Sequence, residues 1–222
     1  MSSRDDAAPP AARDSAASLD DAAWQAAPPD AEPDRFAQRR AWLLARVVSG
    51  ERVADLGAGL GHFAAALQGA GCEVVALDSS PIAVGLARER HPGLDVRRVE
   101  ADGELALEDS SVEVVWAGEV IEHVADTAAW LSEVRRVLRS GGRLLLSTPY
   151  HGRVKTAALA LARHEEHFDP RGPHLRFYTR PALRELLLDF GFEDVALSTL
   201  GGPPLLRATL LAEARRARFV FA

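Results

Sequence analysis

Two acidic residues and three glycines between residues 53 and 78 form the chemically most specific pattern in the chain. Residues 53–61 read VADLGAGLG, and the apolar run at 74–77 ends at Asp78. Glycines in a loop after a buried strand let a ligand approach the backbone closely, because no Cβ is in the way. A carboxylate that ends the next strand can bind the two hydroxyls of a ribose. The pattern therefore predicts a loop that binds a nucleoside cofactor.

The spacing of the glycines argues against a dinucleotide. The dinucleotide fingerprint is G-x-G-x-x-G, whereas the third glycine here, Gly61, comes one position early and is followed by His62. Asp55 lies two residues before the first glycine, Gly57. Its charge would repel a pyrophosphate and would suit a cationic ligand. A glycine-rich turn without function is the remaining alternative.

A second chemical pattern, GEVIEHV, occupies residues 118–124 after an apolar run. In a helical turn, Glu119, Glu122 and His123 are at positions i, i+3 and i+4 and face the same way. Two carboxylates and an imidazole on one face form a partial site for a divalent cation. They also suit a general base with groups that orient it. Both interpretations stay open.

Residues 151–180 contain four of the seven histidines of the chain, namely His151, His164, His167 and His174. A lone histidine is more often a surface residue than a ligand, but four in one segment favour a place for at least one of them in the site. His174 is the preferred candidate and His167 the second.

These residues need a scaffold of alternating strands and helices from residue 36 onward, which is typical of a parallel sheet with helical crossovers. Residues 150–180 break the alternation and are expected to form an insertion on the substrate side. The expected helices are 36–48, 62–69, 81–90, 127–138 and 181–190, and the expected strands are 52–55, 73–78, 96–100, 112–117, 143–148, 192–199 and 207–214. The last of these could equally be helical by propensity.

Length and composition limit the class of protein to which the chain can belong. The 222 residues suit one α/β domain. We expect no membrane span and no signal peptide, because apolar runs are short and the N-terminus lacks the basic-then-apolar layout. The single cysteine, Cys72, excludes an internal disulfide framework and fits a reducing compartment, so a cytoplasmic location is expected.

Charge is concentrated at the N-terminus. Residues 1–34 contain two basic and eight acidic residues, which accounts for the whole net charge of −6. This Ala- and Pro-rich stretch is expected to be a disordered tail, with docking of 19–24 over the site as an alternative, and 35–222 is expected to form the domain. A neutral domain disfavours nucleic acid as a substrate.

The D-x-G-x-G-x-G pattern at residues 55–61 resembles motif I of the class I S-adenosylmethionine-dependent methyltransferases, and the likeness extends over about 36–215. It implies a three-layer α/β/α sandwich with a Rossmann-like seven-stranded sheet in the order 3-2-1-4-5-7-6, the last strand antiparallel. It also implies S-adenosylmethionine as the cofactor. The implied cofactor-binding residues are Asp55, Gly57, Gly59, Gly61, Asp78, Ser79, Ile82, Asp102 and Gly118. Of these, Asp78 takes the ribose, Asp102 the adenine amino group and Ile82 the adenine face.

Residues 119–123 resemble the E-x-x-E-H element of ubiquinone-pathway O-methyltransferases and of the enzymes that methylate small-RNA 3′ ends. This resemblance implies a divalent cation on Glu119, Glu122 and His123, although in many small-molecule methyltransferases the acids only cap and hydrogen bond. The cation needs a further ligand, for which His174 of the histidine-rich segment is the candidate. His174 begins a segment, HLRFYTR, that is similar to one before the penultimate strand in many relatives.

The expected function is methyl transfer to a small-molecule hydroxyl, with His123, Glu119 and His174 as catalytic residues. A metal-assisted RNA 2′-O-methyltransferase and a non-catalytic cofactor-binding scaffold are the alternatives. The sequence makes no prediction about oligomeric state.

Overall fold

The structure is a computed structural model that describes residues 21, 24–26, 28, 31–100, 104–167, 169, 172, 174–203 and 206–218, without the side chains of Glu166 and His167. Most of the predicted tail, 1–34, therefore lies outside the described residues. The same holds for Asp102, whose predicted contact with adenine stays a prediction.

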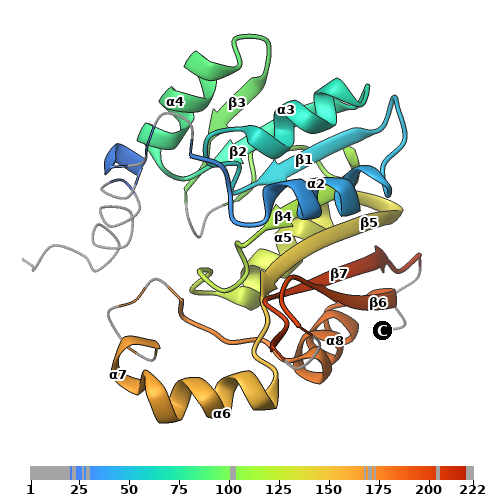
Figure 1. The fold of residues 1–222 in the computed structure, drawn as a ribbon. Coiled ribbons are helices and arrows are strands. Elements are labelled where there is room, and N and C mark those ends of the chain that lie inside the picture. Colours follow the sequence, from blue (N-terminus) through green and yellow to red (C-terminus); the bar gives the residue numbers. More distant parts are fainter. Residues whose placement is uncertain are drawn as a thin grey trace, which may run out of the picture.

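Seven strands form one mixed sheet in the order β3-β2-β1-β4-β5-β7-β6, as the resemblance implied (Figure 1). The strands are β1 (Arg52–Leu56), β2 (Glu73–Asp78), β3 (Asp95–Arg98), β4 (Val112–Gly118), β5 (Leu138–Pro149), β6 (Phe192–Leu200) and β7 (Thr209–Arg216). β7 runs antiparallel to both of its neighbours, β5 and β6, and the other pairings are parallel. The alternative of a helix at 207–214 is wrong, because these residues pair with two strands.

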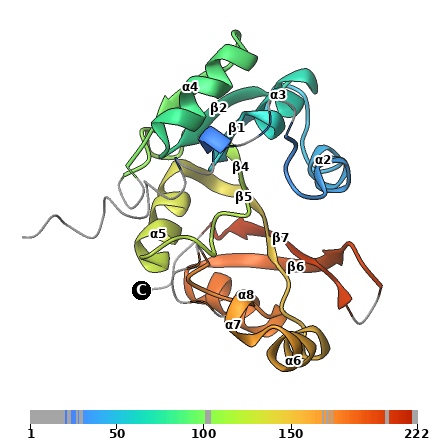
Figure 2. The ribbon, with the colours of Figure 1, turned by 60° about the vertical axis from the view of Figure 1, so that its left-hand side comes forward.

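Helices cover both faces of the sheet (Figure 2). They are α2 (Phe36–Leu44), α3 (His62–Gly69), α4 (Pro81–Arg90), α5 (Thr127–Val137), α6 (Arg153–Ala162), α7 (His164–His167) and α8 (Arg180–Asp189). Successive strand residues point to opposite faces. Val53 packs with α2 and α3, whereas Ala54 belongs to the core that contains Leu131 of α5 and Leu183 of α8.

Some boundaries differ from the expected ones. β5 begins at Leu138 directly after α5, five residues earlier than predicted, because Leu138 pairs with Val112 across a register shift in β4. The predicted helix at 36–48 ends at Leu44.

The predicted insertion begins with α6 and α7 and returns to the sheet in an extended segment at 174–179. No residue of α6 is buried, and Leu161 is 90% exposed. Within the part of the chain that is described, no helix has the length and apolar character needed to cross a membrane.

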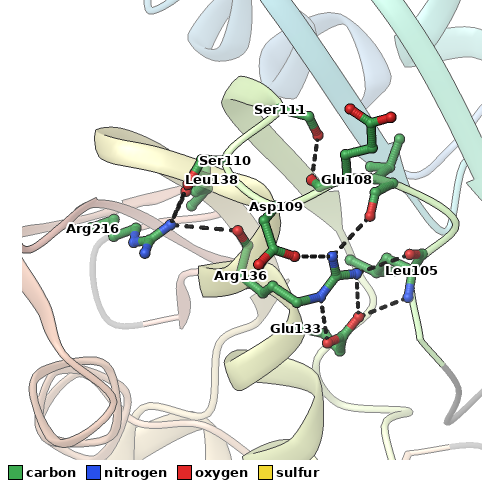
Figure 3. A network of polar contacts seen from close by, with 10 residues as sticks. Leu105, Glu108, Asp109, Ser110, Ser111, Glu133, Arg136, Leu138 and Arg216 are labelled. Atoms are coloured by element: carbon green, nitrogen blue, oxygen red, sulfur yellow. Dashed lines mark hydrogen bonds and ion pairs between the residues drawn. The ribbon is translucent and has the colours of Figure 1, made fainter.

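One arginine connects α5 to the loop before β4 (Figure 3). Arg136 donates hydrogen bonds to Glu133, to Asp109 and to the carbonyl oxygens of Leu105 and Leu107, at 2.8–3.0 Å. Glu133 in turn accepts a hydrogen bond from the Leu105 N–H at 2.9 Å. The network therefore fixes the loop that leaves β3 against a helix of the core.

Candidate active site

The glycine loop lies at the carboxyl end of β1. Gly57, Gly59 and Gly61 have φ values of 65°, 52° and 80°, a left-handed conformation that favours glycine. A Cβ on Gly57 would lie 2.5 Å from Val120 Cγ2, and one on Gly61 would lie 3.0 Å from the ring of His91. Both the backbone conformation and the close neighbours therefore require glycine in this loop.

Asp78 connects the glycine loop to the loop after β2. Its two carboxylate oxygens accept hydrogen bonds from the N–H groups of Gly59 and Ser80, at 2.7 and 2.9 Å. The residue is 8% exposed, and a carboxylate oxygen can accept more than one hydrogen bond. Ser79 and Ile82 follow it and are half-buried at the start of α4. The arrangement fits the predicted ribose site.

Asp55, at the end of β1, is buried to 1% exposure. It accepts a hydrogen bond from the Ala64 N–H, but among the described residues its Oδ2 atom has no hydrogen-bond partner. Burial, and secondly the charge of Asp78, raise the pKa of Asp55 to about 8. Two neighbouring carboxylates make this loop suitable for a cationic ligand.

A buried arginine, which sequence reasoning missed, lies beside these acids. Arg39 of α2 is 2% exposed, with its guanidinium over the rings of Phe63 and Trp116. Its Nη1 donates to the Asp34 carbonyl oxygen at 3.2 Å, while Nε and Nη2 have no hydrogen-bond partner among the described residues. Burial lowers the pKa of Arg39, against the charge of Glu119.

Arg40, the next residue of this helix, is exposed. The spacing of Phe36, Arg39 and Leu43 (i, i+3, i+7) was the signal that could have identified the buried arginine. Gly118, at the end of β4, makes room for Arg39, since a Cβ there would lie 2.5 Å from its Nη2.

Residues 119–123 form a turn after β4, not the predicted helical turn. Glu119 has a φ of 61°, and its N–H donates to the Ser147 carbonyl oxygen at 2.9 Å. Its Oε1 accepts a hydrogen bond from Ser147 Oγ at 2.9 Å and lies 4.0 Å from Arg39 Nη2. Burial raises the pKa of Glu119, against the charge of Arg39. The i, i+3, i+4 argument was therefore wrong, because Glu119 is held by β5.

Glu122 is the buried acid of this turn, at 1% exposure. Its Oε2 accepts a hydrogen bond from Thr148 Oγ1 at 3.0 Å, and its Oε1 lies 3.9 Å from His123 Nε2. Burial, and secondly the charge of Glu119, raise the pKa of Glu122 to about 8. The carboxyl group can therefore exchange a proton near neutral pH.

The extended segment after the insertion brings His174 to this turn. The N–H of Leu175 donates to the Glu122 carbonyl oxygen at 2.8 Å, and the Arg176 guanidinium donates to the carbonyl oxygens of Val124 and Ala125. As a result, the ring centroids of His123 and His174 are 4.9 Å apart.

Three of the four predicted metal ligands thus lie together. Glu122, His123 and His174 each offer one ligand atom, and these three atoms lie within 4.8 Å of one another. Glu122 is buried, His123 is half-buried and His174 is exposed. Glu119 is not part of this group. His151 is buried, with its ring 4.6 Å from that of Phe177, and His164 begins α7. His167 also lies in α7, but its side chain is not described.

Comparison with known proteins places this geometry in a family. A sequence model described as a methyltransferase domain matches residues 30–197. The chain belongs to the class I S-adenosylmethionine-dependent methyltransferases. It is 30% identical over 176 residues to a ubiquinone biosynthesis O-methyltransferase of Thiobacillus denitrificans, and the alignment covers 75% of each protein.

The methyltransferase is also 36% identical over 156 residues to a probable S-adenosylmethionine-dependent methyltransferase of Mycobacterium tuberculosis (strain CDC 1551). That alignment covers 70% of this chain and 53% of the relative, so the chain spans about half the length of that protein.

Two solved structures share the fold of the methyltransferase. One is from a complex between the Haloferax volcanii Trm112 methyltransferase activator and a methyltransferase, with a TM-score of 0.68, 23% identity and coverage of 92% of this chain and 97% of that one. The other is Haemonchus contortus phosphoethanolamine N-methyltransferase 2 in complex with S-adenosyl-L-methionine, with a TM-score of 0.67, 17% identity and coverage of 82% and 53%.

Proposed function

We propose that this methyltransferase transfers the methyl group of S-adenosylmethionine to a hydroxyl group of a small molecule. The observation that carries the proposal is the cluster of Glu122, His123 and His174, which follows β4 at the same sheet edge as the glycine loop and Asp78. Ligands of open α/β sheets bind at the carboxyl ends of the strands. The cluster would therefore supply a proton acceptor at the sheet edge where we propose that the cofactor binds.

The polar groups of the first two loops fit the cofactor. Asp78 would accept hydrogen bonds from the ribose hydroxyls. The cationic part of the ligand would lower the pKa of Asp55 from about 8 and favour its charged form. Arg39, two nitrogens of which lack hydrogen-bond partners among the described residues, suits the carboxylate of the methionine part. Ser79, Ile82, Asp102 and Gly118 remain proposed cofactor contacts on the strength of the family resemblance.

S-adenosylmethionine supplies a methyl group that its sulfonium already activates for displacement. The chain has to align the acceptor and remove the hydroxyl proton. We assign to His123 the role of the base that accepts this proton, with Glu122 and His174 next to it to orient the imidazole. Glu119 takes a positioning role, because its carboxylate lies between Ser147 and Arg39.

The same cluster fits a divalent cation, which is a second way to activate a hydroxyl. Two imidazole nitrogens and one carboxylate oxygen suit such an ion, and Oε1 of Glu122 has no hydrogen-bond partner among the described residues. A bound cation lowers the pKa of a hydroxyl that coordinates it. In this variant of the proposal, Glu122, His123 and His174 would hold the ion.

The acceptor class rests on indirect support. The ubiquinone-pathway relative is named as an O-methyltransferase, and residues 35–222 carry no net charge, which disfavours the RNA alternative. Phe177, 38% exposed and next to His151 and His174, gives the acceptor an aromatic wall. A cytoplasmic location stays a proposal that rests on the single free Cys72.

Labelled methyl transfer to matched acceptors tests the proposal. The full chain is incubated with S-adenosylmethionine that carries a deuterated methyl group and with pairs of phenols and anilines of the same skeleton, and products are detected by mass spectrometry. We expect labelled ethers from phenols and none from anilines. His174→Ala should lose the product, whereas His164→Ala, a matched change in the same insertion, should keep it.

Chelation separates the two modes of activation. Activity that survives thorough chelation assigns the removal of the hydroxyl proton to His123 alone. Activity that is lost and then restored by a divalent cation indicates that the cation lowers the pKa of the hydroxyl, whose proton then passes to a base or to solvent. Exclusive methylation of the anilines would contradict a hydroxyl acceptor, and bound cofactor without transfer to any acceptor would favour the scaffold alternative.

A further inference from the structure

A short N-terminal helical turn contacts the cofactor loops, although it lies outside the matched methyltransferase domain. Residues 21 and 24–26 are helical, and Figure 2 shows this turn in blue at the carboxyl ends of β1 and β2. The ring of Trp24 lies against Gly59, since a Cβ on that glycine would be 2.8 Å from the ring. The Ser80 hydroxyl donates a hydrogen bond to the Asp21 carboxylate. One turn therefore contacts both loops.

These two contacts lie on either side of the proposed ribose site. Gly59 and Ser80 are the residues whose N–H groups donate to the two oxygens of Asp78, at 2.7 and 2.9 Å. Trp24 contacts Gly59, and Asp21 accepts the hydrogen bond from Ser80. The turn thus bridges the two loops that hold the Asp78 carboxylate, and Ser80 is left only 2% exposed.

The contacts suit a part that closes over a ligand. Ser80 Oγ already accepts a hydrogen bond from the Ala83 N–H and caps α4, so its bond to Asp21 adds a link that the helix does not need. Gly59 offers no side chain, and the three atoms nearest to a Cβ on it all belong to the Trp24 ring, at 2.8–3.7 Å. An indole supplies a large apolar surface with few rotatable bonds. Trp24 remains half-buried.

We propose that Trp24 and Asp21 form a cap over the adenosine end of the cofactor site, and that this cap retains bound cofactor. The inference rests on the proposed function, because it takes Asp78 as the ribose ligand. Cofactor that lies beneath the cap can leave only when the turn detaches from Gly59 and Ser80. The rate of cofactor release is then set by the opening of the cap, as it is for lids in other enzymes.

Dissociation kinetics of S-adenosylhomocysteine test the cap. The full chain is loaded with this product, a large excess of S-adenosylmethionine is added, and the release rate is measured by stopped flow, with dissociation constants from calorimetry. Trp24→Ala should raise the release rate and the dissociation constant by about tenfold, as for truncation of a central aromatic contact. Trp24→Phe should fall between wild type and Trp24→Ala, and Asp21→Ala should shift both constants in the same direction.

Gln25→Ala is the matched control, because Gln25 is an exposed residue of the same turn. It should leave both constants unchanged. Circular dichroism and melting temperature establish that the Trp24 variants fold, so that a faster release reports the cap.

Two results would overturn the cap alone: release rates in Trp24→Ala that equal those of wild type, or tighter binding, which would mean that the turn occupies the place of the cofactor. A wild-type chain that binds neither S-adenosylmethionine nor S-adenosylhomocysteine would overturn the proposed function as well.

Discussion

At the scale of single residues, burial raises the pKa of an acid in the proposed cofactor site. Asp55 lies at 1% exposure beside a second acid, Asp78, and its pKa is raised to about 8. Between its usual pKa of 3.8 and this value, the folded chain keeps a proton that the unfolded chain has lost. Unfolding therefore releases a proton in this range, and rising pH favours the unfolded state.

The first prediction follows from that sign. Asp55→Asn removes the titrating group and keeps an oxygen that can accept the hydrogen bond from the Ala64 N–H. From about pH 4 to pH 8, the free energy of unfolding of wild type should decrease relative to that of the variant, on the order of a few kcal/mol over the whole range. Urea unfolding at a series of pH values measures the difference. Parallel pH profiles would show that Asp55 is ionised in the folded chain.

The second prediction concerns the buried arginine. Arg39→Gln should weaken S-adenosylhomocysteine binding by about tenfold or more, because a buried charged hydrogen bond is lost. Binding of methylthioadenosine, which lacks the carboxylate, should change little. Calorimetry with both ligands measures the ratio. An equal loss for the two ligands would mean that Arg39 supports the fold and does not contact the carboxylate.

At the scale of elements, the positions of the proposed catalytic groups depend on contacts between segments far apart in the sequence. The turn after β4 is held by Ser147 and Thr148 of β5 on one side and by Leu175 and Arg176 on the other. Asp126 then caps α5 by accepting a hydrogen bond from the Ala129 N–H at 2.9 Å. The position of the cluster therefore depends on three elements: β5, the segment at 174–179 and α5.

The third prediction tests the link to the extended segment. Arg176→Met removes the hydrogen bonds to Val124 and Ala125, so His174 should move away from His123. Methyl transfer to an acceptor found in the phenol panel should slow by about tenfold or more, while the dissociation constant of S-adenosylmethionine stays unchanged. Arg180→Met, an exposed change nearby, should affect neither. Loss of cofactor affinity in Arg176→Met would indicate general disruption instead of local positioning.

The fourth prediction concerns the Arg136 network in Figure 3. Arg136→Met removes hydrogen bonds to Glu133, Asp109, Leu105 and Leu107, so the free energy of unfolding should fall by about 1–3 kcal/mol. Arg139→Met is the control, because Arg139 is 56% exposed and its ion pair with Glu113 should contribute less than about 1 kcal/mol. Equal effects in urea unfolding would show that the network adds nothing beyond surface charge.

At the scale of the whole molecule, the family resemblance was sufficient for the sheet order. The individual strands and helices follow local signals, such as the apolar run of β4, the glycines after β1 and Pro81 at the start of α4, whereas the role of the glycine loop in cofactor binding stays a prediction. The left-handed Glu119 could not be predicted, because hydrogen bonds to Ser147 on another strand hold it in that conformation. Arg39 was missed because an arginine in a helix is normally expected at the surface. Its burial depends on Phe63 and Trp116, which belong to other elements.

The contacts of the N-terminal segment likewise depend on residues that are distant in the sequence. Its composition favoured disorder, yet Asp21 and Trp24 contact Ser80 and Gly59. These contacts join positions that are 59 and 35 residues apart in the sequence, and nothing in the local pattern encodes them. Sequence reasoning raised docking only as an alternative.

The measurement that tests the central claim most directly is calorimetric titration of S-adenosylmethionine into wild type and Asp78→Asn. The account predicts one cofactor per wild-type chain and binding weaker by about a hundredfold in the variant, because two hydrogen bonds to a charged carboxylate are lost. Near-ultraviolet circular dichroism of the ligand-free proteins checks that the variant keeps the fold. Equal affinity in the two proteins would contradict the placement of the methyl donor on Asp78 and, with it, the proposed active site.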